Sequence, residues 1–218
     1  MVLIGQYDSP FVRRVAIALH HYELRFDRRV LSVFKDFDQM LAINPLGKVP
    51  SLILDDGETL FDSRAIIDYL DANVSAERRL APIQEPHRRQ VLKIEAVGIG
   101  LAEKVYERGI EYTRRAPGTS DPKWRSRLEL QIASACRWLE SRATSGWFYG
   151  DSFTRADLAV AVSMQYLERV LPQLESVSQC PRLQEHRQSC EALEAFAAVN
   201  DSRDEALASG WRPEATSV

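Results

Sequence analysis

Short apolar runs and helical periodicity alternate along the first 75 residues of the chain. Runs rich in β-branched and aromatic residues predict strands, and apolar residues spaced three and four apart predict helices. Asp55-Asp56-Gly57 is a strong turn signal between two such runs and predicts a β-hairpin. In chain order, the predicted elements are a strand at 2–6, a helix at 10–21, a strand at 25–30, a short helix near 36–42, the hairpin within 47–63 and a helix at 63–73.

The pattern changes near residues 74–86, which carry two prolines and show no clear period. Long helical patterns follow, and strand signals are nearly absent. The predicted helices cover 86–115, 123–144, 154–171, 181–190 and 191–208. The fold class expected is therefore α/β plus all-α, with a first domain at 1–75, a linker at 76–86 and a helical domain at 87–218.

Ser9 and Pro10 form a start signal for the first helix, with Ser9 as N-cap and Pro10 at the first helical position. Capping alone would explain the serine. The same hydroxyl can also donate its one proton outward, and the helix start adds about half a positive charge. A thiol placed there would have its pKa lowered, so Ser9 is a candidate for holding a thiolate.

The hairpin region adds two candidate binding features. Pro50 stands at the mouth of a strand, where its bond to Val49 could be cis, exposing the Val49 backbone to an extended peptide, or trans, merely starting the strand. Asp62 or Ser63 caps the next helix. Beyond capping, the free N–H groups and the Ser63 hydroxyl would suit a ligand carboxylate, and Asp62 would suit an ammonium.

With these elements in place, the chain resembles the cytosolic glutathione S-transferases, and more narrowly their serine-dependent bacterial and tau-like members. The resemblance covers nearly the whole chain and implies a thioredoxin-like first domain followed by a helical bundle. Its motifs are Ser9-Pro10-Phe11 with Arg14-Val15, Asn44-Pro45-Leu46-Gly47-Lys48-Val49-Pro50, Asp62-Ser63-Arg64-Ala65-Ile66, and the capping-box segment Gly150-Asp151-Ser152-Phe153-Thr154-Arg155-Ala156-Asp157-Leu158-Ala159.

The resemblance implies a role for each matching residue. Ser9 would donate to the sulfur of glutathione, and Val49 before a cis Pro50 would pair with its cysteinyl unit. Asp62 and Ser63 would take the γ-glutamyl ammonium and carboxylate, although the family more often has Glu or Gln at the position of Asp62. The glycine carboxylate would face Lys48 and Lys35.

The sequence leaves the assignment of other parts of the site undecided. Tyr7 is an alternative to Ser9 as thiol donor, because some family members use a tyrosine near the chain start. The small, hydrophobic electrophile would lie between the first helix start and the first long helix of the second domain. Its candidate contacts are Phe11, Val105, Tyr106, Ile110 and Trp211. A homodimer is implied by the resemblance alone.

Composition and residue spacing bear on binding to nucleic acid, membranes and metals. The net charge of −3 gives no basic footprint for nucleic acid, and adjacent pairs such as Arg13-Arg14 are expected on solvated faces. No apolar run is long enough to span a membrane, and no secretion signal begins the chain, so a cytoplasmic location is expected. The three cysteines form no Cys-x-x-Cys pair, and the four histidines lack metal-ligand spacing, so no metal is expected.

The sequence therefore predicts an enzyme that activates the glutathione thiolate for attack on a small electrophile. A serine at the first helix start excludes thiol–disulfide transfer through that position. A glutathione-dependent isomerase, dehalogenase or peroxidase would keep the same residues and remains an alternative. A non-catalytic binding or regulatory protein on the same scaffold is a second alternative, although it would often lose the anion site.

Overall fold

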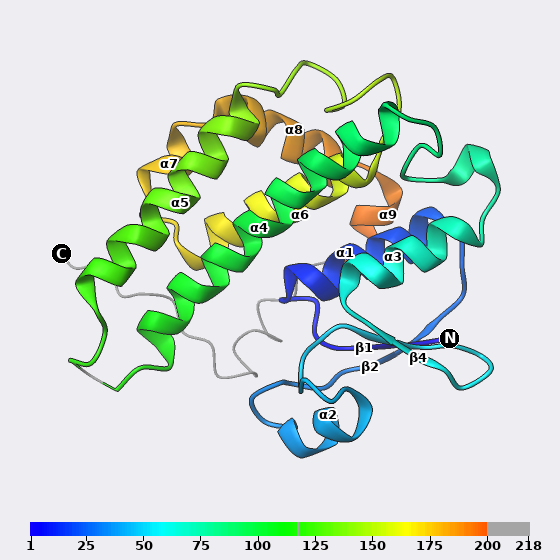
Figure 1. Ribbon diagram of the computed structural model, residues 1–218, viewed down its shortest axis with the longest axis horizontal. Coiled ribbons are helices and arrows are strands. Elements are labelled where there is room, and N and C mark those ends of the chain that lie inside the picture. The colour runs from blue at the N-terminus through cyan, green and yellow to red at the C-terminus, as the bar shows by residue number, and fades with distance from the viewer. Residues whose placement is uncertain (117, 200–218) are drawn as a thin grey trace. The chain divides into compact units, whose positions relative to one another are not determined.

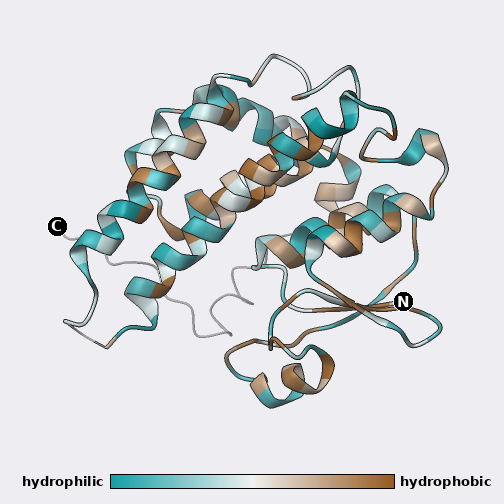
Figure 2. Cartoon of the chain, viewed as in Figure 1, coloured by the Kyte–Doolittle hydropathy of each residue, from teal (hydrophilic) through white to brown (hydrophobic). Residues whose placement is uncertain are grey.

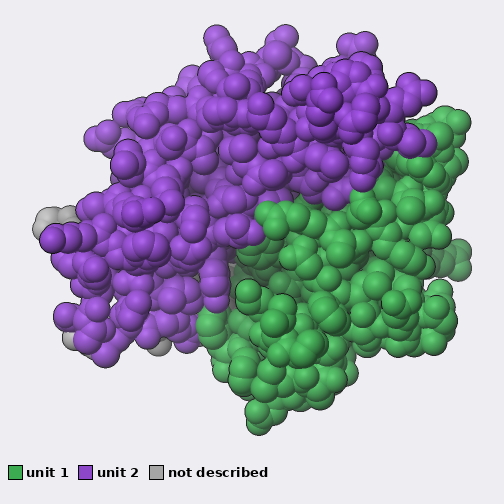
Figure 3. All heavy atoms as spheres, in the orientation of Figure 1, with its two compact units in different colours: residues 1–79, 192–211 green, residues 80–191, 212–218 purple. Residues whose placement is uncertain are grey.

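A computed structural model describes residues 1–116 and 118–199 of the chain (Figure 1). The described residues fall into two compact units (Figure 3). Unit 1 contains residues 1–79 together with 192–199, and unit 2 contains residues 80–191. The division between the units lies inside the predicted linker, but residues 192–199 join unit 1, whereas the prediction placed all of 87–218 in the second domain.

Unit 1 is built on a four-stranded sheet in the order β2-β1-β3-β4. Strand β1 (Val2–Ile4) pairs in parallel with β2 (Asp27–Arg29) and antiparallel with β3 (Ser51–Ile53). Strand β4 (Thr59–Phe61) completes the hairpin, with Leu52 opposite Leu60. Gly57, at φ 91°, occupies the left-handed region inside the turn, which a glycine adopts without steric cost. The predicted hairpin is therefore confirmed.

Helices lie on both faces of this sheet. Helices α1 (Pro10–His21) and α3 (Ser63–Ala72) pack side by side, and α2 (Phe37–Ile43) covers the opposite face (Figure 1). Met40 of α2 packs with Ile4 and Leu31. Because successive residues of a strand point to opposite faces, the buried side chains of Leu3 and Ile4 pack on opposite faces of the sheet. The central strands are correspondingly hydrophobic along much of their length (Figure 2).

The two arginines of α1 correct one expectation. Arg13 and Arg14 are 2% and 0% exposed, so they do not lie on a solvated face. The Nε of Arg13 donates to the carbonyl of Val199 over 3.1 Å, and its guanidinium lies 5.6 Å from the centre of the Phe196 ring. The end of the described chain is thereby fixed against α1 within unit 1.

Unit 2 is helical and is centred on α6 (Arg155–Val170), which is buried around most of its circumference. It packs against α4 (His87–Thr113) and α8 (Pro181–Glu191), while α5 (Pro122–Glu140) packs against α4. A Cβ added at Gly98 of α4 would lie 3.1 Å from backbone atoms of α6. The Ser163 hydroxyl donates to the Gly98 carbonyl over 2.7 Å at this close approach.

The C-terminal helical prediction is wrong in the part of the chain that the structure describes. The chain turns after α8, and only a short helix α9 (Glu194–Ala197) follows, so no single helix begins at 191. Two further short helices, η1 (Ala76–Arg78) and α7 (Glu175–Ser178), were not predicted. Both Val49–Pro50 and Glu85–Pro86 are cis peptide bonds, so the structure decides between the cis and trans alternatives that the sequence allows at Pro50.

Candidate active site

The predicted thiolate site lies at the start of α1. Ser9 is the N-cap, with an extended backbone, and its Oγ accepts the N–H of Val12 over 3.4 Å. Pro10 occupies the first turn, as predicted. Since a serine hydroxyl accepts through its lone pairs and donates through one hydrogen, capping does not use the donor capacity of Ser9. The side chain is half-buried and stands where the helix dipole is positive.

Val49 lies close to this helix start because of a glycine. At Gly5, which has φ 132°, an added Cβ would lie 2.5 Å from the Cγ2 of Val12 and 3.1 Å from the Cβ of Val49. A side chain at position 5 would therefore collide with both valines. Glycine at this position lets Val49, which precedes the cis bond to Pro50, lie near Val12 in the first turn of α1.

Asn44 organises the loop that leads to Val49, and sequence reasoning assigned it no role. Its Oδ1 accepts the N–H of Leu46 over 2.9 Å, and its Nδ2 donates to the carbonyl of Lys48 over 2.9 Å. The side chain is 2% exposed, so both bonds are shielded from water. The signal was an asparagine directly before a proline, a combination that favours turns, within the quoted motif.

The start of α3 brings Asp62 and Ser63 together. Asp62 is the N-cap, and its Oδ1 accepts the N–H of Arg64 over 2.8 Å. Its φ of 70° is unusual for a residue with a side chain and costs about 1–3 kcal/mol, a strain that clusters at functional sites. Ser63 is buried, and its Oγ accepts from the Nη1 of Arg14 over 3.1 Å. Asp62 itself is exposed and so accessible to a ligand.

The remaining glutathione candidates are the two lysines that flank α2. Lys35 precedes this helix and Lys48 follows it, and both are exposed. The backbone N–H of Lys35 donates to the hydroxyl of Ser32 over 3.4 Å, and the Lys48 carbonyl is held by Asn44. The structure therefore fixes both backbones and leaves both ammonium groups at the surface of unit 1.

Tyr7, the alternative thiol donor, is engaged through its ring. The guanidinium carbon of Arg28, in β2, lies 3.5 Å from the ring centre, a close cation–π contact. This contact packs Tyr7 against the sheet. The contact involves the ring and not the hydroxyl, so the choice between Ser9 and Tyr7 as donor stays a prediction.

The electrophile candidates lie in both units, and their assembly into one site stays a prediction. Phe11 of α1 is half-buried. On α4, Val105 is fully buried, Tyr106 is 41% exposed and Ile110 is half-buried. Val105 therefore has no side-chain surface to offer a ligand in this structure. Trp211 lies outside the described residues.

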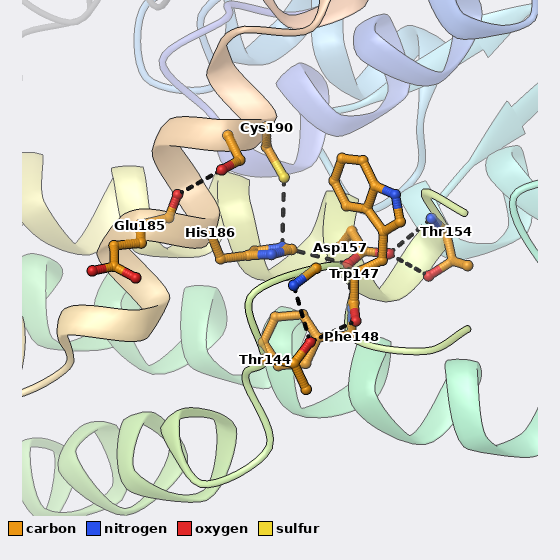
Figure 4. Close-up of polar contacts among 10 residues, drawn as sticks. Thr144, Trp147, Phe148, Thr154, Asp157, Glu185, His186 and Cys190 are labelled. Carbon is orange, nitrogen blue, oxygen red and sulfur yellow. Dashed lines mark hydrogen bonds and ion pairs between the residues drawn. The ribbon is translucent and has the colours of Figure 1, made fainter. Parts of the chain in front are cut away.

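A second polar cluster lies in unit 2, around Asp157 of α6 (Figure 4). The Asp157 carboxylate accepts the N–H of Phe148 over 2.8 Å, and the N–H and hydroxyl of Thr154 over 2.8 and 2.7 Å. The Nε2 of His186 lies 3.5 Å from its Oδ1. The predicted capping box between Thr154 and Asp157 is confirmed.

This cluster does not have the geometry of a catalytic triad. The sulfur of Cys190 lies 3.5 Å from Nε2 of His186, the same ring nitrogen that faces Asp157 (Figure 4). In a triad the nucleophile and the acid occupy opposite ring nitrogens. All three side chains are buried, and the rings of Phe148 and Trp147 pack edge-on against His186. The cluster stabilises the fold of unit 2.

A pH dependence of stability follows from His186. Burial lowers the pKa of this histidine below its usual value, although Asp157 opposes the shift. Below about pH 6.5 the unfolded chain binds a proton at this residue that the folded chain binds less readily, so stability falls as the pH drops. The gap in free energy of unfolding between wild type and His186→Asn is expected to shrink by about 1 kcal/mol from pH 7.5 to 5.5.

Urea unfolding at several pH values measures this gap. His21, whose pKa burial also lowers, is present in both proteins and cancels in the comparison. A gap that widened toward low pH would mean that an imidazolium ion pairs with Asp157 in the fold.

Residues 1–116 and 118–199 contain no group of three or more His, Cys, Asp or Glu side chains arranged to hold a metal ion. No helix within the same ranges has both the length and the apolar character needed to cross a bilayer.

A thioredoxin-like unit and a helical unit define the class of fold, and comparisons with known proteins identify the family. Residues 3–78 match the family "Glutathione S-transferase, N-terminal domain", and residues 122–189 match "Glutathione S-transferase, C-terminal domain". The chain is 30% identical to the uncharacterized GST-like protein YibF of Escherichia coli (strain K12), over 79% of this chain and 85% of that protein. This chain belongs to the glutathione S-transferase family.

Two further similarities concern function. The chain is 27% identical to a maleylacetoacetate isomerase of Pseudomonas aeruginosa, covering 78% of this chain and 82% of that protein. A crystal structure of a glutathione S-transferase from Methylobacillus flagellatus KT, with GSH bound, is 28% identical and has a TM-score of 0.85; the similarity covers 92% of this chain and 99% of that one. The predicted family, fold class and enzyme class are thus confirmed, while the serine-dependent subtype and the site residues stay predictions.

Proposed function

We propose that this protein binds glutathione on unit 1 and holds its sulfur as a thiolate at the start of α1. The observation that carries the proposal is the hydroxyl of Ser9, which accepts the N–H of Val12 and keeps its hydrogen for a ligand. A hydrogen bond to a charged acceptor contributes about 1.5–3 kcal/mol, and the helix dipole favours the same negative charge. Both effects lower the pKa of a thiol bound there.

The rest of the tripeptide would bind to the residues that the family resemblance implies. The backbone of Val49 would pair with the cysteinyl unit beside the Ser9 helix start, and Lys48 and Lys35 would face the glycine carboxylate. The γ-glutamyl end would reach the start of α3. There Asp62 caps the helix through Oδ1, and because a carboxylate has two oxygens, this bond is compatible with receiving the ligand ammonium on the other.

In the proposed reaction the bound thiol loses its proton to solvent, and the thiolate forms a sulfur–carbon bond to a small, hydrophobic electrophile. In a substitution, the bond from that carbon to a leaving group such as halide breaks, and the anion departs to solvent. In an addition to a conjugated double bond, the π bond breaks and the neighbouring carbon takes a proton from solvent. Conjugation would be accelerated by a raised thiolate fraction and by holding the two reactants together. Of the residues predicted to contact the electrophile, Phe11, Tyr106, Ile110 and Trp211 stay candidates, whereas Val105 is fully buried and is left out of the proposal. A cytoplasmic location, expected from the sequence, and a homodimer, implied by the family resemblance, belong to the same proposal.

The experiment that tests the proposal is an ultraviolet titration of the glutathione thiolate on the protein. In wild type the bound thiol should titrate well below the value of about 8.5 that is usual for a free thiol. Replacement Ser9→Ala should raise this pKa by about 1–2 units and lower kcat/KM about ten- to hundredfold, in line with one hydrogen bond to a charged acceptor.

Two matched variants sharpen this experiment. Ser9→Thr keeps a hydroxyl at the cap and should retain most of the shift, whereas Tyr7→Phe should leave the titration unchanged. A titration that moved in Tyr7→Phe and not in Ser9→Ala would transfer the donor role to the tyrosine.

An isomerase is the second candidate, favoured by the similarity to the Pseudomonas aeruginosa maleylacetoacetate isomerase. Such an enzyme uses the same activated thiol transiently, adding it to a conjugated double bond and eliminating it after rotation about the resulting single bond. Glutathione would then be unconsumed. Measuring glutathione consumption alongside product formation with a cis-enone acid and with an aryl halide separates the two reactions.

A further inference from the structure

Arg14 is a buried cation directly behind the start of α3. Its side chain is 0% exposed, and its Nη1 donates to the Oγ of Ser63 over 3.1 Å. The two residues come from neighbouring helices, since α1 and α3 pack side by side (Figure 1). Ser63 is itself only 4% exposed, so the bond is shielded from water.

This bond limits the directions in which the Ser63 hydroxyl can donate. A guanidinium donates only, and a serine hydroxyl carries one hydrogen and two lone pairs. Because Arg14 occupies the acceptor side of the Ser63 oxygen, the hydroxyl hydrogen must point away from the cation. Asp62, one residue earlier, holds the helix start through the N–H of Arg64 over 2.8 Å. Ser63 is thereby preset as a hydrogen-bond donor at a helix N-terminus, a place that favours anions.

We propose that Arg14 is a positioning residue for the γ-glutamyl carboxylate of glutathione: it orients the Ser63 hydroxyl toward that carboxylate and adds a buried positive charge behind it. The proposal rests on the proposed function for the identity of the ligand. It is independent of the thiol chemistry at Ser9. The guanidinium is fully buried, and interactions between charges are screened less inside a protein than in water.

Two unreactive peptides test this assignment by calorimetry. S-methylglutathione carries the carboxylate, and γ-aminobutyryl-S-methylcysteinylglycine replaces that carboxylate with hydrogen. Wild type should bind the first about ten- to hundredfold more tightly, as expected for a hydrogen bond to a charged group. In Arg14→Met and in Ser63→Ala this preference should fall to about threefold or less, and the double variant should lose little more than either single one.

Arg14→Lys is the conservative variant. It keeps the positive charge and lacks the planar fork of donors, so it should restore part of the preference. The matched control is Arg13→Met, which removes the neighbouring buried arginine whose bond runs to Val199. This control should lower the melting temperature and leave the preference between the peptides at the wild-type ratio. A merely structural role for Arg14 would make Arg14→Met behave like the control.

A measurement on the wild-type protein covers the case in which the Arg14 variants do not fold. The Nε–H resonance of Arg14 should move more when S-methylglutathione binds than when the peptide without the carboxylate binds. Equal movement, or an unchanged preference in a folded Arg14 variant, overturns the inference. If wild type binds both peptides equally well, glutathione binding stands and this inference falls. If it binds neither, the proposed function falls with it.

Discussion

Replacing Asp157 with alanine is expected to destabilise the protein by about 3–5 kcal/mol, the cost of removing one partner from a buried, charged network. The carboxylate satisfies the backbone N–H groups of Phe148 and Thr154, and both donors would be stranded in the core of unit 2. Each stranded donor costs about 1–3 kcal/mol. His186 would also lose the group that faces its Nε2. The melting temperature should fall on the order of 10 °C.

Urea unfolding monitored by circular dichroism measures this loss of stability. Two further variants serve as comparisons. Asp157→Asn keeps one acceptor oxygen and should retain part of the lost stability. Asp151→Ala removes an exposed carboxylate from the loop before the same helix and should change stability by less than about 0.5 kcal/mol. A loss in Asp157→Ala no larger than in Asp151→Ala would show that the cluster contributes little to folding.

The second large effect is expected at the ion pair between Glu95 of α4 and Arg155 of α6. The Nε of Arg155 lies 3.2 and 3.1 Å from the two carboxylate oxygens, and the side chains are 3% and 4% exposed. Arg155→Met alone leaves a buried carboxylate with one partner fewer and should cost about 3–5 kcal/mol. Replacing both residues with methionine should recover most of that loss, because neither charge is then buried.

Guanidinium unfolding of the two single variants and the double variant gives the coupling energy of the pair. The exposed contact between Arg78 and Glu23 is the comparison, with side chains 48% and 72% exposed. Glu23→Gln should cost about 1 kcal/mol or less, as surface ion pairs do. A double methionine variant as unstable as Arg155→Met would show that packing between α4 and α6, rather than the charge left behind, sets the cost.

Local signals predicted most of unit 1. The Ser9-Pro10 pair fixed the start of the first helix, which spans 10–21 as predicted. Asp55-Asp56-Gly57 located the hairpin turn, and apolar spacing located α3 to within one residue. In each case the information lies within a few residues, where capping, turn geometry and periodicity decide the outcome.

The sequence-based predictions failed where contacts between residues far apart in the chain determine the structure. Residues 191–208 have strong helix formers and no internal proline, yet the described chain turns before Leu193, and Phe196 is buried against Arg13. Tertiary packing overrides helix propensity there. Hydrophobic periodicity also does not predict which polar side chains will meet in the fold. Examples are the burial of Arg14, the two hydrogen bonds of Asn44 and the contact of His186 with Asp157.

The bond between Arg13 and Val199 joins residues separated by 186 positions, and this separation matters during synthesis. Ribosomes add about 5–20 residues per second, so roughly 10–40 s separate the appearance of the two partners. Throughout that interval Arg13 of the nascent first helix lacks the contacts with Phe196 and Val199 that it makes in the folded protein. Truncated chains released before residue 199 would carry the same exposed cation and so offer a surface on which cellular quality control could act.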